Sequence, residues 1–295
     1  MPEKLIEKRP AATDDAETNK SAKKQKKDSD TIPILRGRFK QRWLTKHSHL
    51  LKRSDDASGI LVSCSVNAET RALGQVSTCL EHYITKLFPD HSSTWVRFEG
   101  KLDIDQIDFD DEEKAADQKD EDKAVNEKER KEKKFQAIDA ACGGLVFYRF
   151  RVDVKPTEFV IKLMDHIKQL PDKEREQELG KLRHCARWIP LDYICPAITE
   201  RIASCFERVK ADYFDTKDET TEDTVAIITE IRNNIMIKKE EIIQTIAPLI
   251  PPKYKVNLKK PTYVIFVTVF KSACGITVLK DYYERKRYNL VAYCQ

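Results

Sequence analysis

The sequence is poor in the glycine-rich patterns with which many enzymes hold phosphates. Only eight of its 295 residues are Gly, and neither G-x-G-x-x-G nor G-x-x-x-x-G-K-[ST] occurs. The G-x-S-x-G nucleophile elbow is also absent. An acetyl-CoA site commonly needs a glycine-rich loop or a helix N-terminus that faces the pyrophosphate, and no stretch presents one. We therefore expect a chain with no catalytic residues and no cofactor of its own.

Metal-binding and membrane patterns are missing as well. The eight cysteines include no C-x-x-C pair, and the six histidines do not pair at metal spacing. His47 and His49 stand two apart in an expected helix, where they would point to different faces. The N-terminus lacks the apolar core of a signal peptide, and no apolar run approaches the roughly 20 residues of a membrane span. We expect a soluble, intracellular protein with reduced cysteines, no metal site and no small-molecule substrate.

Charge is plentiful, and it is unevenly spread along the chain. Charged residues make up 35% of the sequence, yet the formal net charge is only +4. Basic residues prevail in 1–53 and again in 251–287, whereas 103–113 is almost wholly acidic. A chain with separate basic regions suits a nucleic-acid binder better than a uniformly neutral enzyme.

The first 55 residues are expected to form a basic arm. Residues 1–30 contain almost no large apolar side chain, which predicts disorder. The lysine run 23–27 suits a nuclear localisation signal or a solvated charge run. In 36–52, cations interleave with apolar residues such as Phe39 and Trp43. This pattern predicts an amphipathic helix that binds RNA or a partner, or that docks on its own domain.

The next region has the pattern of a ferredoxin-like domain, residues 56–194. Strand and helix patterns alternate, with strands at 59–66, 94–98, 144–154 and 181–194 and helices at 68–88 and 156–170. The resulting order, strand–helix–strand–strand–helix–strand, is the βαββαβ arrangement. A charged stretch, 101–138, interrupts it and is expected to be an acidic insertion that forms a solvated surface loop.

A second α/β unit follows at 195–283, with an alternative start near residue 165. Its expected elements are helices at 196–212 and 238–250 and strands at 224–231, 256–258, 263–270 and 274–279. The run 263–270 has no Gly, Pro or charge, so it predicts a buried strand. Residues 284–295 read as a basic tail. Overall we expect an α+β protein.

Four ordered pieces of sequence resemble a known family. They are Ser58-Gly59-Ile60-Leu61-Val62-Ser63-Cys64, Arg187-Trp188-Ile189-Pro190-Leu191, Glu230-Ile231-Arg232-Asn233-Asn234 and Lys271-Ser272-Ala273-Cys274-Gly275-Ile276-Thr277-Val278 with Lys280-Asp281-Tyr282-Tyr283. Together they resemble the THUMP-domain family of stand-alone tRNA-modification adaptors, the partners of the tRNA cytidine acetyltransferase. The resemblance implies a THUMP domain in the second unit and tRNA as the ligand.

The resemblance also implies a role. The chain would present serine and leucine tRNAs to the acetyltransferase for N4-acetylcytidine formation, in the nucleus or nucleolus and also in the cytoplasm. Most THUMP proteins fuse this module to a catalytic domain, and this chain stops soon after the signature, which favours a non-catalytic adaptor. Two other interpretations stay open: a small RNA-modifying enzyme with an unrecognised active site, and an RNA- or protein-interaction factor in ribosome assembly.

Twelve polar residues are expected to contact RNA: Arg183, Arg187, Arg232, Asn233, Asn234, Lys238, Lys253, Lys255, Lys259, Lys260, Lys271 and Lys280. Guanidinium forks and amides suit phosphates and sugar hydroxyls, and the lysines are expected to cluster around the last strands. For Asn233 and Asn234, the alternative to RNA contact is a turn in the left-handed backbone conformation that Asn tolerates. Arg183 and Arg187 are expected on one face of a strand. For these two residues, the alternative to RNA contact is an ion pair with Glu176 or Glu178.

Overall fold

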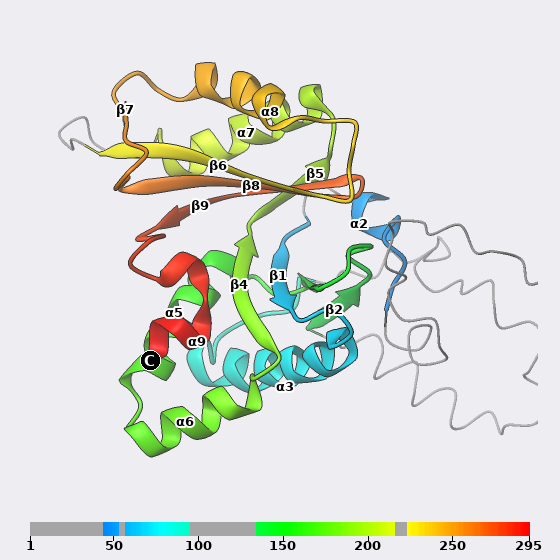
Figure 1. Ribbon diagram of the computed structural model, residues 1–295, viewed down its shortest axis with the longest axis vertical. Coiled ribbons are helices and arrows are strands. Elements are labelled where there is room, and N and C mark those ends of the chain that lie inside the picture. Colours follow the sequence, from blue (N-terminus) through cyan, green and yellow to red (C-terminus); the bar gives the residue numbers. More distant parts are fainter. Residues whose placement is uncertain (1–43, 53–56, 95–133, 216–222) are drawn as a thin grey trace, which may run out of the picture. The chain divides into compact units, whose positions relative to one another are not determined.

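The computed structural model describes residues 44–52, 57–94, 134–215 and 223–295 (Figure 1). All of them belong to one compact unit, Thr31–Gln295. Most of the predicted basic arm and of the predicted acidic insertion lies outside the described residues, so the expectations for those segments stay predictions. The described part is a mixed α/β structure with two sheets.

The first sheet has the strand order β2-β3-β1-β4, and every neighbouring pair is antiparallel. Its strands are β1 (Gly59–Cys64), β2 (Phe135–Ile138), β3 (Leu145–Phe150) and β4 (Cys185–Leu191). Its helices are α3 (Glu69–Leu87), α5 (Pro156–Gln169) and α6 (Asp172–Lys181). The chain order agrees with the predicted βαββαβ arrangement except for α6, a second helix between α5 and β4.

The second strand of this sheet lies where the sequence analysis placed the acidic insertion. The predicted insertion 101–138 includes all of β2, whose Phe135 and Ile138 are buried. The strand was missed because its four residues directly follow a charged run, so that the whole segment had the composition of a solvated loop. Of the predicted strand 94–98, only Thr94 is described, and it belongs to no strand. That assignment of the second strand is therefore wrong.

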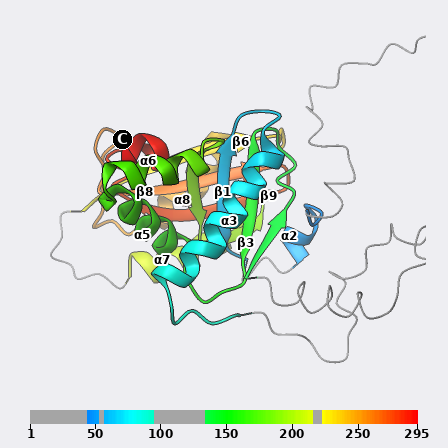
Figure 2. The same ribbon diagram turned by 90° about the horizontal axis from the view of Figure 1, so that it is seen from below.

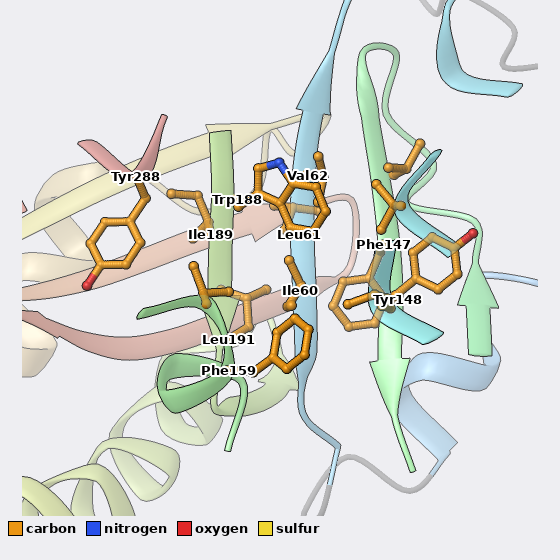
Figure 3. Close-up of a cluster of buried hydrophobic side chains, with 14 of the residues drawn as sticks. Ile60, Leu61, Val62, Phe147, Tyr148, Phe159, Trp188, Ile189, Leu191 and Tyr288 are labelled. Carbon is orange, nitrogen blue, oxygen red and sulfur yellow. The ribbon is translucent and has the colours of Figure 1, made fainter. Parts of the chain in front are cut away.

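The core of the first sheet is formed by apolar side chains from its strands and from its helices. Figure 3 shows Ile60, Leu61 and Val62 of β1 beside Trp188 and Ile189 of β4. All of these side chains belong to one buried cluster. Helix α3 lies across β1 and β3 in Figure 2, and it contributes apolar residues at helical spacing.

The second sheet has the order β5-β9-β8-β6-β7. Its strands are β5 (Tyr193–Pro196), β6 (Thr224–Arg232), β7 (Lys255–Val256), β8 (Tyr263–Phe270) and β9 (Ala273–Lys280). β6 runs parallel to β7 and β8, whereas β9 is antiparallel to β8 and β5. Helices α7 (Thr199–Tyr213) and α8 (Lys239–Ile246), followed by η3 (Ala247–Leu249), cover one face (Figure 1).

Strand β8 is buried on both faces, as its sequence predicts. Ile265, Val267 and Val269 pack in the cluster formed with α7 and α8. Phe266 and Phe270 point the other way and join the core of the first sheet. Because successive side chains of a strand point to opposite faces, a sheet covered on both sides needs an unbroken apolar run.

The predicted basic tail, 284–295, is folded against the core of the first sheet. It forms η4 (Lys286–Tyr288) and α9 (Leu290–Cys294). Tyr288 and Leu290 have no exposed surface. A tail that buries such side chains is part of the core and not a free charged extension.

An ion pair holds this C-terminal segment to α5. Arg285 donates two hydrogen bonds to the carboxylate of Asp165, at 2.7 and 3.1 Å, and the Tyr293 hydroxyl donates a third at 2.9 Å. Partial burial acts to raise the pKa of Asp165, but the hydrogen bonds from Arg285 and Tyr293 hold it below its ordinary value.

The predicted helix 36–52 is wrong over most of its described part. Only α2 (His49–Lys52) is helical, and Thr45 instead forms a parallel bridge with Ile138 of β2. His47 lies in the turn between them and is buried, with 6% of its surface exposed. Its Nδ1–H donates to the carbonyl of Asp139 at 3.0 Å, which leaves Nε2 to accept from the Ser272 hydroxyl at 3.1 Å.

The chain passes from the first sheet to the second at Asp192, between β4 and β5. The expected strand 181–194 therefore contributes to both sheets. The carboxylate of Asp192 accepts hydrogen bonds from the backbone N–H and hydroxyl of Thr157, at 3.0 and 2.7 Å. It also accepts from the hydroxyls of Tyr213 and Thr277. These donors come from α5, α7 and β9, so one side chain connects three elements.

Replacing Asp192 with Ala should lower the free energy of unfolding by about 3 kcal/mol, because the hydroxyls of three partners, two of them buried, lose a charged acceptor. Urea denaturation followed by circular dichroism measures this. The control is Asp172→Ala on α6, whose side chain is 85% exposed and pairs with Arg175. That surface pair should contribute less than about 1 kcal/mol. Equal losses in the two variants would contradict the role of Asp192.

Folding stability should also depend on the protonation of His47. Burial, and then the nearby Lys271 charge, lower its pKa, although the bond to Asp139 acts in the opposite direction. The folded state therefore keeps His47 neutral, whereas the unfolded chain takes up a proton below about pH 6.5. The contribution of this group is unchanged above that pH and becomes destabilising as the pH falls below it.

We therefore expect acidification from neutral pH to reduce the unfolding free energy of the wild type more than that of His47→Gln. Urea titrations of both proteins at a series of pH values measure the difference. Parallel pH curves for the two proteins would show that His47 does not contribute.

Candidate functional site

The twelve polar residues predicted to contact RNA do not form one cluster. Lys259 and Lys260 precede β8, whereas Lys271 follows it. An eight-residue strand separates its ends by roughly 25 Å. The expectation that Lys271 groups with Lys253–Lys260 is therefore wrong. Ten of the twelve lie at opposite ends of the second sheet, the left and right ends in Figure 1, and Arg183 and Arg187 lie elsewhere.

One group lies where β6 ends beside the β8–β9 turn, and we call it the Arg232 end. Its predicted residues are Arg232, Asn233, Asn234, Lys238 and Lys271. Arg232 is opposite Phe270 in the register of β6 and β8, so the loop after Arg232 lies next to Lys271. Arg232, Lys238 and Lys271 are exposed, and within the described chain no ion pair engages them.

The two asparagines at this end shape the loop. Asn233 has a φ of 52°, in the left-handed region that Asn tolerates, and its amide donates to the Ala141 carbonyl at 2.7 Å. Asn234 donates to the Lys271 carbonyl at 2.6 Å. Its Oδ1 accepts from the backbone N–H groups of Met236 and Ile237. Both amides are thus engaged within the protein, as the turn interpretation requires.

The other group surrounds the start of β8, and we call it the lysine end. It consists of Lys253, Lys255, Lys259, Lys260 and Lys280, all exposed. The register places Thr224 opposite Lys255 and Tyr263 opposite Lys280, which brings the edge strand β7 and the end of β9 to this side. Among the described residues, Lys255, Lys259, Lys260 and Lys280 take part in no ion pair.

The loop before β8 holds the two central lysines of this end. The Oδ1 of Asn257 accepts hydrogen bonds from the backbone N–H groups of Lys259 and Lys260, both at 3.0 Å. Their backbone is therefore held in a turn while their side chains project into solvent. The ammonium groups of Lys255, Lys259, Lys260 and Lys280, which take part in no ion pair within the described residues, can contact successive phosphates of a nucleic acid without reading its bases.

Arg187 has a different environment from the one predicted. Its Nη1 forms an ion pair with Glu230 of β6 at 2.6 Å, and only 24% of its side chain is exposed. Its other nitrogens donate to the Tyr282 hydroxyl and the Arg287 carbonyl, both at 3.1 Å. Arg187 therefore connects the first sheet to the second. The alternative to RNA contact, an ion pair with a glutamate, was therefore the right type of interaction for Arg187. The partner, however, is neither Glu176 nor Glu178.

Arg183 is exposed and does not share a strand with Arg187. It lies in the turn after α6, whereas β4 begins two residues later at Cys185. Together with His184 and Asn289 it lines a hollow of about 240 Å³ between this turn and α9. The structure therefore does not bring Arg183 to either end of the second sheet.

The sequence motifs behind the family resemblance meet one another at the junction of the two sheets. A Cβ at Gly275 would lie 2.5 Å from the side chain of Leu191 of β4, so a larger residue here would force the buried Leu191 side chain to move where β9 and β4 cross. Thr277 bonds to Asp192, and Ser272 bonds to His47. This structural role was not predicted from the sequence. The signal for it in the sequence was the presence of small and hydroxyl-bearing residues within the otherwise apolar strand β9.

The described residues give little support for a metal site, a membrane-spanning helix or a nucleophilic cysteine. No three His, Cys, Asp or Glu side chains within this part of the chain come close enough to hold a metal ion. Nor is any helix of the described segments long and apolar enough to cross a membrane. None of the eight cysteines, all of which the structure describes, forms a disulfide bond, and burial raises the pKa of the Cys142 thiol to about 11. That pKa disfavours the thiolate that a nucleophilic cysteine needs.

Part of the second half of the chain matches a known domain family. Residues 197–279 match the THUMP domain family. The chain is 26% identical over 240 residues to THUMP domain-containing protein 1 of Mus musculus and of Homo sapiens, which covers 79% of this chain. It spans 63% of the mouse protein and 62% of the human protein.

A yeast protein and a solved structure extend the comparison. The chain is 26% identical over 246 residues to "tRNA acetyltransferase TAN1" of Saccharomyces cerevisiae, which covers 79% of this chain and 83% of that protein. PH1313 from Pyrococcus horikoshii Ot3 superimposes with a TM-score of 0.38 and 8% identity, over 76% of this chain and 55% of that one. The match over residues 197–279 and the similarity over 79% of the chain confirm the resemblance seen in the sequence, which is to THUMP-domain proteins.

Proposed function

We propose that this chain is a tRNA-binding adaptor that presents serine and leucine tRNAs to a cytidine acetyltransferase for N4-acetylcytidine formation. The observation that carries the proposal is the similarity, over 79% of the chain, to a yeast protein whose name states tRNA acetyltransfer. The THUMP domain and the exposed lysines of the second sheet support it. In this role the acetyltransferase brings acetyl-CoA and ATP, and this chain binds the substrate RNA.

The lysine end is the RNA-binding surface in this proposal. Lysine ammonium groups act as point charges toward phosphate and carry no base preference. A set of them on one edge of a sheet suits a ligand that is recognised by the shape of its backbone, as folded RNA is. The Asn257 turn keeps Lys259 and Lys260 side by side, so both can contact one stretch of backbone.

A second candidate function is that this chain is itself the acetyltransferase, which the name of the yeast relative favours. The two functions differ in what the purified chain does alone. An enzyme transfers acetyl groups from acetyl-CoA to tRNA without a partner. An adaptor binds tRNA but needs the acetyltransferase for product.

Reconstitution distinguishes them. The purified chain, the tRNA cytidine acetyltransferase, acetyl-CoA, ATP and serine tRNA are combined and then omitted one at a time, and N4-acetylcytidine is measured by mass spectrometry. We expect product only when both proteins are present. Product from this chain alone would establish the enzyme instead. Equal product with and without this chain would rule out the adaptor role.

Charge reversal tests the lysine end. Lys259→Glu/Lys260→Glu should weaken tRNA binding about 10-fold or more and reduce the salt slope of log K by roughly 2, because two phosphate contacts are lost. The matched control is Lys86→Glu/Lys173→Glu, the same charge change on exposed residues of α3 and α6. Filter binding at several salt concentrations measures affinity and slope. Equal losses in the two variants would show that only net charge matters.

A further inference from the structure

The Arg232 end presents the two most exposed large apolar side chains of the described chain. Ile235 is 94% exposed and Met236 is 83% exposed, and they are neighbours in sequence. Single exposed apolar residues are ordinary on protein surfaces, but an adjacent pair at the tip of one loop forms a patch. Ile237, the next residue, is buried and anchors the loop beneath them.

This loop is held in place before any partner binds. The Asn234 side chain accepts from the N–H groups that follow Ile235 and ties the loop to the β8–β9 turn through the Lys271 carbonyl. Asn233 ties it to Ala141 in the β2–β3 connection. Two apolar side chains on a preorganised loop lose little conformational freedom when they enter a pocket.

Four cations lie at the same end of the sheet as the apolar pair. Arg232, Lys238, Lys239 and Lys271 are all exposed, and within the described residues they form no ion pair. Two carboxylates of α8 are also near, of which Glu241 accepts from the backbone N–H of Lys238. An apolar centre with a cationic rim is complementary to an apolar pocket with a carboxylate rim.

The chemistry of the pair favours a protein over RNA. Neither Ile nor Met has a ring on which a base can stack, and aliphatic side chains gain nothing against phosphates. Met is flexible and polarisable, and it fills irregular apolar pockets well. The loop before β8 contrasts with it: there Asn257 holds a turn whose tip is Lys259 and Lys260.

We propose that the loop of the Arg232 end docks the acetyltransferase, with Ile235 and Met236 entering an apolar pocket whose rim carries carboxylates. The choice of partner rests on the proposed function. Since β8 separates the two ends of the sheet by roughly 25 Å, the chain holds RNA at its lysine end and the enzyme at its Arg232 end at the same time. The adaptor thus bridges substrate and enzyme.

The test compares two variants that remove similar apolar groups from opposite ends of the sheet. Ile235→Ser/Met236→Ser alters the proposed docking loop, and Val256→Ser/Leu258→Ser is the control, with side chains 73% and 72% exposed. Binding of each to the immobilised acetyltransferase is measured by biolayer interferometry. The docking variant should bind about 10-fold or more weakly, as loss of a central apolar contact does, and the control should bind as the wild type does.

Three further readouts make the result specific. tRNA affinity of the docking variant should equal that of the wild type, and excess variant should restore acetylation in the reconstituted reaction. Sedimentation should show the same oligomeric state for the docking variant and the wild type. Wild-type affinity of the docking variant for the acetyltransferase overturns the proposal, as does an equal loss in the control.

Other results overturn it in favour of another ligand. If the docking variant loses tRNA affinity as Lys259→Glu/Lys260→Glu does, the loop is an RNA contact. If only the wild type self-associates, the loop binds a second copy of this chain. If the wild type does not bind the acetyltransferase at all, the proposed function fails and takes this inference with it, an outcome that the variants do not influence.

Discussion

One carboxylate, that of Asp192, lies at the crossing on which the arrangement of the two sheets depends. It occupies the single residue between β4 and β5, where the chain leaves the first sheet and enters the second. Its hydrogen-bond donors come from α5, α7 and β9. A charged acceptor with several short bonds gives more directional constraint than apolar packing, which is largely non-directional. The crossing angle of the sheets is thereby restricted at one point.

The junction is formed by the residues through which the chain resembles THUMP-domain proteins. Arg187 of β4 pairs with Glu230 of β6, and Gly275 of β9 permits the close approach of Leu191. Each of these residues belongs to one of the four sequence motifs, and the contacts join different motifs. Their shared role is to hold two sheets in one orientation. A family signature of this kind reports the architecture, and the ligand-binding residues need not lie within it.

Holding the sheets in this way leaves the two ends of the second sheet free for binding. Both ends are loops organised by an Asn side chain that accepts two backbone N–H groups, at Asn234 and at Asn257. The side chains displayed are different: an aliphatic pair within a cationic rim at one end, and a row of lysines at the other. A rigid strand between the ends keeps them apart, so two ligands need not compete for one surface.

The amino-acid sequence by itself determined the elements with strong local patterns. The apolar run of β8 and the periodic helices α3, α5 and α7 formed as predicted, because burial on both faces or on one face leaves a direct mark on composition. The four motifs were sufficient to indicate the THUMP domain. The missing phosphate-binding and C-x-x-C patterns are also properties of the sequence alone.

Tertiary structure decided what spacing along the chain does not encode. Lys260 and Lys271 are close in sequence, yet β8 carries them to opposite ends of the sheet. Arg187 and Glu230 are distant in sequence, yet the junction brings them to 2.6 Å. Strand β2 and the docked C-terminal segment were missed because their stability comes from partners far along the chain, Phe150 and Asp165 among them. Long-range pairing has no local signal, so the grouping of the charged residues became visible only in the folded chain.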